Sequence, residues 1–205
     1  MLSGASPRLV SCVDASRAGG QAVEIALVVA IVAVVVALLQ GGSLERLADT
    51  KFRAVPLLLL GLALQIVFGF WSPSWMTDGL GLAVLIVSNV LVLAWLIVNR
   101  SLPGLLIAAA GLLMNLVVIS ANGAMPVSAD AVRTAGGETL EISEEGLKHE
   151  VLDDDTRLGF LGDIIPLPAL GIWSVGDLVL AAGLALLAYR QTRWGDPRAA
   201  GAASG

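Results

Sequence analysis

Five long apolar runs, separated by short polar breaks and one long acidic segment, dominate the pattern of the chain. The runs cover residues 23–40, 54–71, 79–98, 102–121 and 172–189. Each approaches the roughly 20 apolar residues that a helix needs to cross a bilayer core of about 30 Å. The pattern predicts an all-α fold over residues 23–190: a polytopic transmembrane helical bundle of about five spans.

The segment 122–173 is predicted to be one long acidic loop, because it carries ten Asp/Glu against three Lys/Arg. Its apolar part, residues 158–172, is too short to span a membrane with Asp163 and two prolines inside it. We expect this part to lie at the interface or to fold back between helices, docked over the second, fourth and fifth runs. An unpaired carboxylate is costly there, so Asp163 is expected to pair with Arg157, the nearest candidate.

Lys and Arg are unevenly placed, which predicts an orientation. They occur after the first run, after the third run and in the C-terminal segment, whereas residues 72–78 carry none. Since cytoplasmic loops are enriched in these residues, the N-terminus and the loop 122–173 should face outward and the C-terminus should be cytoplasmic. We therefore expect a multi-pass protein of the cell membrane.

Both ends of the chain look unlike the apolar runs. Residues 1–22 are a polar, Gly/Ser-rich extension, and Gly19-Gly20 can be encoded by a purine-rich sequence just upstream of a GTG codon for Val23. We expect translation to begin at Val23, so that the extension is not made. Residues 191–205 are expected to form a disordered tail.

Composition agrees with a membrane protein and limits the chemistry. The chain is 57% hydrophobic and 14% charged, whereas about a quarter of a soluble domain is charged. No basic face is available for nucleic acid, and the bilayer is the expected partner. Cys12 and His149 are the only residues of their types, which excludes the common His/Cys zinc sites, and the Asp153-Asp154-Asp155 run fails the calcium-loop pattern because its sixth position is Leu158. We expect no metal and no cofactor.

Small and amide residues form stripes within the runs. Gly104, Ala108, Gly111 and Asn115 recur at helical spacing in the fourth run. Such stripes are typical of close helix packing, with amides bonding across the interface. The alternative is a polar cavity formed by the intramembrane polar residues, which are Gln65, Asn89 and Asn115.

Ser174 and Asp177 open the fifth run with the spacing of a capping box, in which the serine accepts from the third backbone N–H and the acid reaches back. This structural account of Asp177 is favoured over a catalytic one. No residue is assigned a catalytic role. A candidate outer-face site is nevertheless defined by the polar and motif residues of this side, namely Asn115, Asn122, Met125, Pro126, Lys148, His149, Arg157, Asp163 and Asp177.

Several short motifs occur in a fixed order. They are Gly41-Gly42-Ser43-Leu44, Asn122-Gly123-x-Met125-Pro126-Val127, Lys148-His149, Thr156-Arg157-Leu158, Phe160-Leu161-Gly162-Asp163 and Ser174-x-Gly176-Asp177. Together they resemble a family of unknown function over about residues 23–189. The resemblance implies a small bacterial integral membrane protein with about five spans, and it implies no activity.

Three classes of function fit this sequence. The first is a non-catalytic module that binds a partner protein or a lipid through its outer loop. The second is a membrane-embedded enzyme acting on a lipid-linked substrate at the outer face. The third is a small carrier or channel. The first is preferred, because no nucleophile–base order supports an enzyme and no intramembrane charge marks an ion path.

Overall fold

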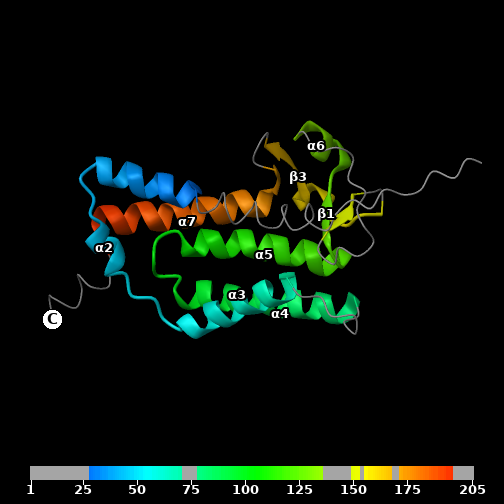
Figure 1. Cartoon of the computed structure of the whole chain (residues 1–205), viewed down its shortest axis with the longest axis horizontal. Helices are drawn as coiled ribbons and strands as arrows, with labels where there is room; N and C mark the ends of the chain where they lie inside the picture. Colours follow the sequence, from blue (N-terminus) through cyan, green and yellow to red (C-terminus); the bar gives the residue numbers. More distant parts are fainter. Residues whose placement is uncertain (1–27, 71–77, 136–148, 153–154, 168–170, 196–205) are drawn as a thin grey trace, which may run out of the picture.

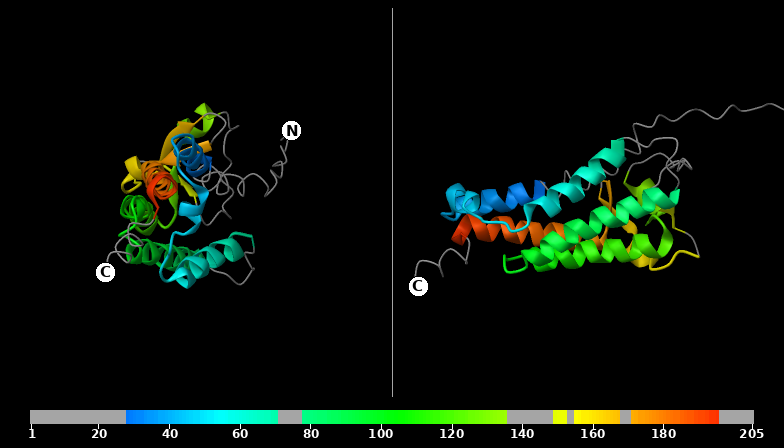
Figure 2. Two further views of the ribbon diagram at one scale, coloured as in Figure 1. Left: turned by 90° about the vertical axis from the view of Figure 1, so that its left-hand side faces the viewer. Right: turned by 90° about the horizontal axis from the view of Figure 1, so that it is seen from below.

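The computed structural model describes residues 28–70, 78–135, 149–152, 155–167 and 171–195. It is mostly helical, and its long helices run lengthwise through the molecule, with one pair tilted against the others and a small sheet at one end of the bundle (Figures 1 and 2). The long helices are Val28–Leu39, α3 (Val55–Phe70), α4 (Asp78–Val98), α5 (Leu105–Asn122) and α7 (Val175–Trp194). The expected extension at residues 1–22 lies outside the described residues.

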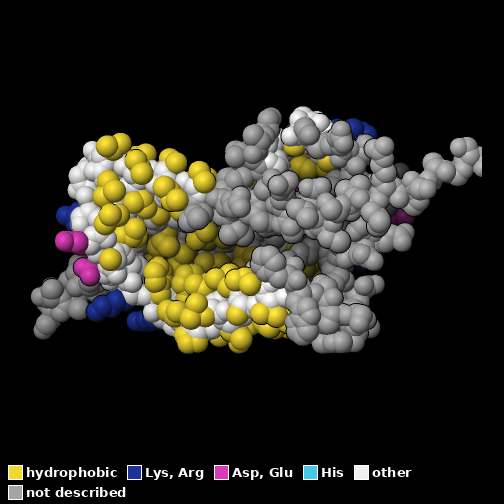
Figure 3. All heavy atoms as spheres, viewed as in Figure 1, with side chains coloured by type: hydrophobic (Ala, Val, Ile, Leu, Met, Phe, Trp, Pro, Cys, Tyr) yellow, Lys and Arg dark blue, Asp and Glu magenta, His cyan; other side chains and the backbone are white. Residues whose placement is uncertain are grey.

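Two of these helices are long and apolar enough to cross a membrane by length and composition. They are Gly79–Val98 within α4 and Leu105–Asn122, which is α5. The helices Val28–Leu39 and Val55–Phe68 are apolar but shorter. Only 17% of the first span and 39% of the second are buried inside the molecule, so neither is enclosed by protein as the core helix of a soluble domain would be. On the face shown in Figure 3, hydrophobic side chains are exposed over much of the helical part.

The closest helix contact joins α5 to α7 through small residues. A Cβ added at Gly111 would lie 2.4 Å from the backbone nitrogen of Leu180, and one added at Gly183 would lie 2.4 Å from that of Ala108. Gly104, at φ +86°, similarly faces the carbonyl oxygen of Gly183. The prediction that this stripe is a packing face is confirmed, since backbones approach this closely only where no side chain intervenes.

A four-stranded sheet lies beyond the C-terminal end of α5, and we call this side of the molecule the sheet end. Its strand order is β2-β1-β3-β4. β1 runs parallel to β2 and β3, whereas β3 and β4 are antiparallel. The strands are β1 (Met125–Val127), β2 (His149–Val151), β3 (Asp163–Leu167) and β4 (Gly171–Ser174), and a short 3₁₀ helix, η1 (Gly159–Leu161), precedes β3.

The sheet corrects the expectation of an all-α chain with one continuous loop at residues 122–173. The segment 158–172 forms η1, β3 and β4 instead of a re-entrant piece between helices. Its Ile165 and Leu167 pack with Trp173 and Ala181, and Val29 of the first helix joins this cluster. Contacts with α5 and α7 were expected, but the contact with the first helix was not. The possible hairpin at Gly136-Gly137 lies outside the described residues.

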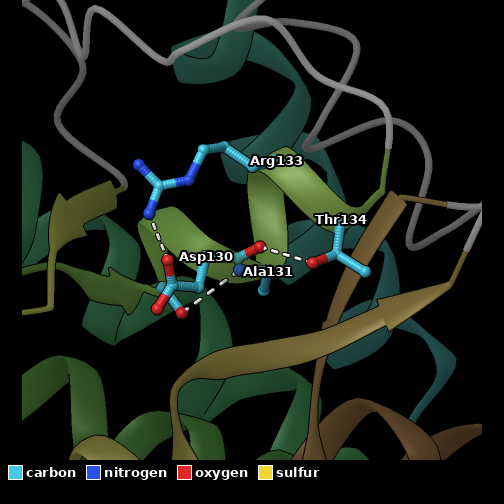
Figure 4. Close-up of polar contacts among 5 residues, drawn as sticks. Asp130, Ala131, Arg133 and Thr134 are labelled. Carbon is cyan, nitrogen blue, oxygen red and sulfur yellow. Dashed lines mark hydrogen bonds and ion pairs between the residues drawn. The ribbon is translucent and has the colours of Figure 1, made fainter.

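A short helix, α6 (Ala129–Thr134), follows β1 and packs beside β3. Ser128 caps it, because its hydroxyl oxygen accepts a hydrogen bond from the backbone N–H of Ala131 at 3.3 Å. Within the helix the Thr134 hydroxyl donates to the Asp130 carbonyl at 2.8 Å, and Arg133 pairs with the Asp130 carboxylate (Figure 4). The described part of this loop is therefore locally ordered by its own side chains.

The opposite end of the bundle, which we call the α2 end, is held by α2 (Leu44–Ala48). The backbone N–H of Ser43 donates to the Thr192 carbonyl at 2.8 Å, which ties α2 to the end of α7. Gln191 and Thr192 are fully buried there. Residues 191–194 are thus helical rather than part of a disordered tail, because α2 covers the last turn of α7.

Candidate functional site

The junction between the sheet and the helices contains a closed group of hydrogen bonds. The Asn115 side-chain amide donates to Asp177 Oδ1 at 2.7 Å, and the Ser174 hydroxyl donates to Asn115 Oδ1 at 3.0 Å. The backbone N–H of Asp177 donates to Ser174 Oγ at 2.9 Å, and that of Ser174 donates to Asp177 Oδ2 at 3.1 Å. Each of these three side chains therefore has polar partners in the other two.

The local sequence explains this arrangement. Ser174 is the N-cap of α7 and Asp177 closes its capping box, as predicted. The carboxylate also lies at the positive end of the helix dipole. Gly176 permits the approach of α5, because a Cβ there would lie 1.8 Å from Asn115 Oδ1. The role of Ser174 as a partner of Asn115 was not predicted, since the sequence shows the stripe of the fourth run and the capping box of the fifth run but not which helices face each other.

Asp163 lies beside this group, at the start of β3. Its Cα is opposite that of Ser174 in β4 and that of Val127 in β1. Its side chain is buried, with 8% of the residue exposed. Burial first, and the negative charge of Asp177 second, raises the pKa of the Asp163 carboxyl to about 8. Asp163 is therefore largely protonated at neutral pH, beside a carboxylate that is engaged in the capping box.

The expected ion pair between Arg157 and Asp163 is wrong. Arg157 is exposed and Asp163 is buried, and the charge that acts on Asp163 is that of Asp177, which raises its pKa rather than lowering it. An adjacent guanidinium would lower the pKa instead. Proximity in sequence was misleading because the β3–β4 pairing brings Asp163 to the start of α7.

Asn122, the last residue of α5, holds the backbone of Arg157. Its side-chain amide nitrogen donates to the Arg157 carbonyl at 2.8 Å, and its Oδ1 accepts from the Arg157 N–H at 2.8 Å. The same nitrogen donates to the Val118 carbonyl of α5 at 2.9 Å. This clamp fixes the start of a turn in which Leu158 adopts φ +55°, a conformation that is uncommon for a residue other than glycine.

The turn after the clamp presents an exposed tip, which we define as Leu158 and Phe160 and call the apolar tip; the exposed Arg157 directly precedes it. Phe160 is 65% exposed and Leu158 is 38% exposed. η1 packs on α5, so the tip lies at the end of that helix. Phe160 was absent from the predicted site; the only sequence signal for it was an aromatic residue within the ordered motif Phe160-Leu161-Gly162-Asp163.

The remaining predicted site residues belong to strands of the sheet or lie outside the described residues. Met125 and Pro126 are buried in β1, a central strand of the sheet. His149 is in β2, where its Cα pairs with that of Met125. Lys148 lies outside the described residues. Among the described residues, no three or more His, Cys, Asp or Glu side chains are grouped in a way that could hold a metal ion.

Asn89 and Asn115, two of the three polar residues expected to form an intramembrane cavity, bond to separate partners. Asn89 donates to the Leu85 carbonyl of its own helix at 2.8 Å, whereas Asn115 bonds to Asp177 across the α5–α7 contact. Gln65 is half-buried on α3, whose Gly61 packs against α4 near the carbonyl oxygen of Ser88.

Comparisons with known proteins identify the family but no activity. No curated protein and no solved structure matches the chain. The family described as "Family of unknown function (DUF5317)" matches residues 49–189. This range includes the Asn122 clamp, the Asn115–Ser174–Asp177 group and Asp163, so the features of the sheet end belong to the matched region. The chain is a member of the DUF5317 family of unknown function.

Proposed function

We propose that the chain is an integral membrane protein that acts as a non-catalytic binding module, with the apolar tip of its outward-facing sheet end as the contact surface for a partner protein. The exposed helix surfaces support the membrane placement. Large apolar side chains such as Leu59, Leu106 and Leu113 are 60%, 59% and 48% exposed, which a bilayer tolerates and water does not.

The charge distribution supports the orientation. The described α2 end carries six basic residues, Arg46, Lys51, Arg53, Arg100, Arg190 and Arg193, against Glu45 and Asp49. The excess of basic side chains favours a cytoplasmic α2 end. The sheet end, with Asp163 and the apolar tip, then faces outward. In this proposal all five apolar helices cross the membrane or lie within it.

The single observation that carries the binding role is the clamped, exposed tip. Phe160 and Leu158 expose apolar surface on the turn that follows the exposed Arg157, and both hydrogen bonds between Asn122 and the Arg157 backbone hold this turn in place. Aromatic and arginine side chains are the residues most enriched among those that dominate binding energy at protein interfaces. A tip whose backbone is already fixed also loses little conformational freedom on binding.

The test of the binding role places a photo-crosslinking phenylalanine analogue at Phe160 in the full chain in cells. We expect a discrete crosslinked protein at this position. The matched control is the same analogue at Thr134, an exposed residue of α6 at the same end. Crosslinks to lipid alone at Phe160 would mean that the tip binds a lipid and not a partner protein. Equal protein crosslinking at both positions would refute a specific binding surface.

The orientation has its own test. A C-terminal fusion to alkaline phosphatase should be inactive, and a C-terminal fusion to a fluorescent protein should be fluorescent, because the C-terminus is proposed to be cytoplasmic. The reverse pattern would refute the orientation. Recovery of the untagged protein in the soluble fraction would refute the membrane placement itself.

A second candidate function is an enzyme acting on a lipid-linked substrate, and Asp163 is the observation that favours it. A carboxyl with a pKa of about 8 is protonated at neutral pH and can donate that proton, as general acids do. The test is incubation of the purified protein with total polar lipids of the host, followed by mass spectrometry. A product formed by the parent and lost in Asp163→Asn would support catalysis; no change in any lipid would exclude it for this lipid set.

A further inference from the structure

Two arginines of the last helical turns lie around one exposed tryptophan at the α2 end. The Arg190 Cζ atom is 5.1 Å from the centre of the Trp194 ring, and the Arg193 Cζ atom is 5.9 Å from it. The ring of Tyr189 meets the Trp194 ring edge-on at 5.7 Å. Trp194 is itself 61% exposed, so the two guanidinium groups are held at the surface by an aromatic ring rather than by a carboxylate.

A third arginine reaches this group from α2. The Arg46 guanidinium donates to the backbone carbonyl of Arg193 at 2.7 Å. Its side chain also lies 3.7 Å from the Cβ that Gly195 would carry. The backbone bond from Ser43 to Thr192 fixes α2 against α7, so the three arginines are brought together by the fold and not by a flexible approach of one segment.

Three like charges at one place favour an anion. The described residues supply no carboxylate within ion-pair distance of Arg46, Arg190 or Arg193. A bound phosphate balances these positive charges, and its oxygens match the planar donors of arginine. The phosphate is expected from a lipid, because apolar side chains are exposed at the same end: Leu39 is 83% and Leu44 is 57% exposed.

We propose that Arg46, Arg190 and Arg193 bind the phosphate of an anionic phospholipid of the inner leaflet, with Trp194 lying at the level of the headgroups. The inference rests on the membrane placement and orientation proposed above, but not on the binding role of the apolar tip. Tryptophan prefers this interfacial depth, and arginine stems extend along the acyl region while their charged groups reach the phosphate. The charge of the patch matches the anionic lipids of the cytoplasmic leaflet.

The test uses the full chain in mild detergent with added dioleoylphosphatidylglycerol, and binding is followed by native mass spectrometry and by the melting temperature. Each arginine that contacts the lipid phosphate is expected to contribute about fivefold in affinity, so the double variant Arg190→Gln/Arg193→Gln should bind about 25-fold more weakly. Phosphatidylcholine should bind the parent much less. Inorganic phosphate should give no comparable rise in melting temperature.

The matched control is Arg100→Gln, which removes one positive charge from the same end. Arg100 is exposed and donates only to the Ile97 carbonyl of its own helix, so its loss should leave lipid affinity within about twofold of the parent. Arg193→Gln alone should weaken binding about fivefold. The same loss in both single variants, or equal binding of the two lipids, would mean that no specific site exists. An equal effect of inorganic phosphate would mean a phosphate site without lipid recognition.

Failure of this proposal is distinguishable from failure of the binding role. Crosslinking at Phe160 takes place at the sheet end, and it should be unchanged in Arg190→Gln/Arg193→Gln. If the parent protein crosslinks at Phe160 but does not bind the anionic lipid, only the proposal for the α2 end is refuted. If it binds the lipid but does not crosslink, only the binding role of the sheet end is refuted.

Discussion

Asn122 and Arg157 are joined as two neighbouring strands would be, with one side-chain amide replacing the backbone of the second strand. Both bonds measure 2.8 Å. The other end of the molecule repeats this arrangement: Asn99, just beyond α4, accepts from the Arg53 N–H at 2.8 Å and donates to the Arg53 carbonyl at 2.9 Å. In each pair the asparagine amide also donates to a carbonyl four residues earlier in the chain. Two distant segments are thus fastened to helix ends by the same chemistry.

The Asn122 clamp predicts a measurable loss on a nearly isosteric change. Asn122→Asp replaces the donating amide nitrogen by an accepting oxygen, so the Arg157 and Val118 carbonyls lose the hydrogen bonds that this nitrogen donates. We expect a loss of about 1–3 kcal/mol in unfolding free energy, measured by thermal unfolding in detergent. Ser120→Ala, at an exposed position of the same helix, should change it by less than about 0.5 kcal/mol. A neutral Asn122→Asp would show that the clamp adds no stability.

The α5–α7 contact predicts that a methyl group added where the two backbones meet destabilises the folded protein. Gly183→Ala would place its Cβ 2.4 Å from the nitrogen of Ala108, so the helices must separate, at a cost of about 1–3 kcal/mol or more. The control is Gly79→Ala in α4, where a Cβ would meet nothing within 4 Å. That change should be neutral or stabilising by up to about 1 kcal/mol. Equal melting temperatures for the two variants would contradict the packing.

The burial of Asp163 predicts a pH dependence of stability. The carboxyl titrates near 3.8 in the unfolded chain and near 8 in the folded protein. Between these values the folded state holds a proton that the unfolded chain has released. Its contribution is therefore fully present below about pH 4 and is lost as the pH rises toward 8, by at most about 1.4 kcal/mol per pH unit.

Asp163→Asn stays neutral at every pH, so the variant should show a flatter profile and exceed the parent in melting temperature at about pH 8. The control is Asp130→Asn, because the Asp130 side chain is 85% exposed and its loss should leave the slope unchanged. Identical pH profiles for the parent and Asp163→Asn would show that the raised pKa of Asp163 is not a property of the folded protein.

The junction group predicts coupling between the side chain of Asn115 on α5 and that of Ser174, the N-cap of α7. Ser174→Ala removes the cap and the donor to Asn115, at a cost of about 0.5–2 kcal/mol. Because Asn115 shares this bond, the double variant Asn115→Ala/Ser174→Ala should lose about 0.5–3 kcal/mol less than the sum of the single variants. The comparison pair Asn89→Ala/Ser174→Ala should be additive, since Asn89 bonds within its own helix. Additivity in both pairs would mean that Asn115 and Ser174 act independently.

The helices were predictable because apolar runs are local signals, and the cap of α7 was predictable from Ser174 and Asp177 alone. The strands were not. β1 and β2 have three residues each, and β1 contains Pro126, which normally argues against a central strand. Their pairing depends on strands that are distant in sequence, so no local periodicity of apolar residues predicts it. The partner of Asp163 was wrong for the same reason: its environment is set by the β3–β4 register.

The candidate site was predictable only as a set of residues, not as a geometry. Asn115 and Asp177 were both identified, but that they touch depends on which face of α5 meets α7. Gly176 and Gly183 decide this by allowing the backbones to approach. Phe160 was missed because apolar residues carry no chemical signal by themselves; its exposure follows from the conformation of Leu158 and the clamp on Arg157.

The contact between α5 and α7 also has a consequence for the order of events during synthesis. The two helices are separated by residues 123–174, and at about 5–20 residues per second a ribosome needs several seconds to make that interval. During this interval the glycine-containing face of α5 has been synthesised, but α7, against which it packs, has not. The sheet is also incomplete when β1 emerges, because β1 pairs with β2 and β3, which are synthesised after it. The last strand ends at Ser174, directly before α7 begins, so the sheet can be completed just before the tightest helix pair closes.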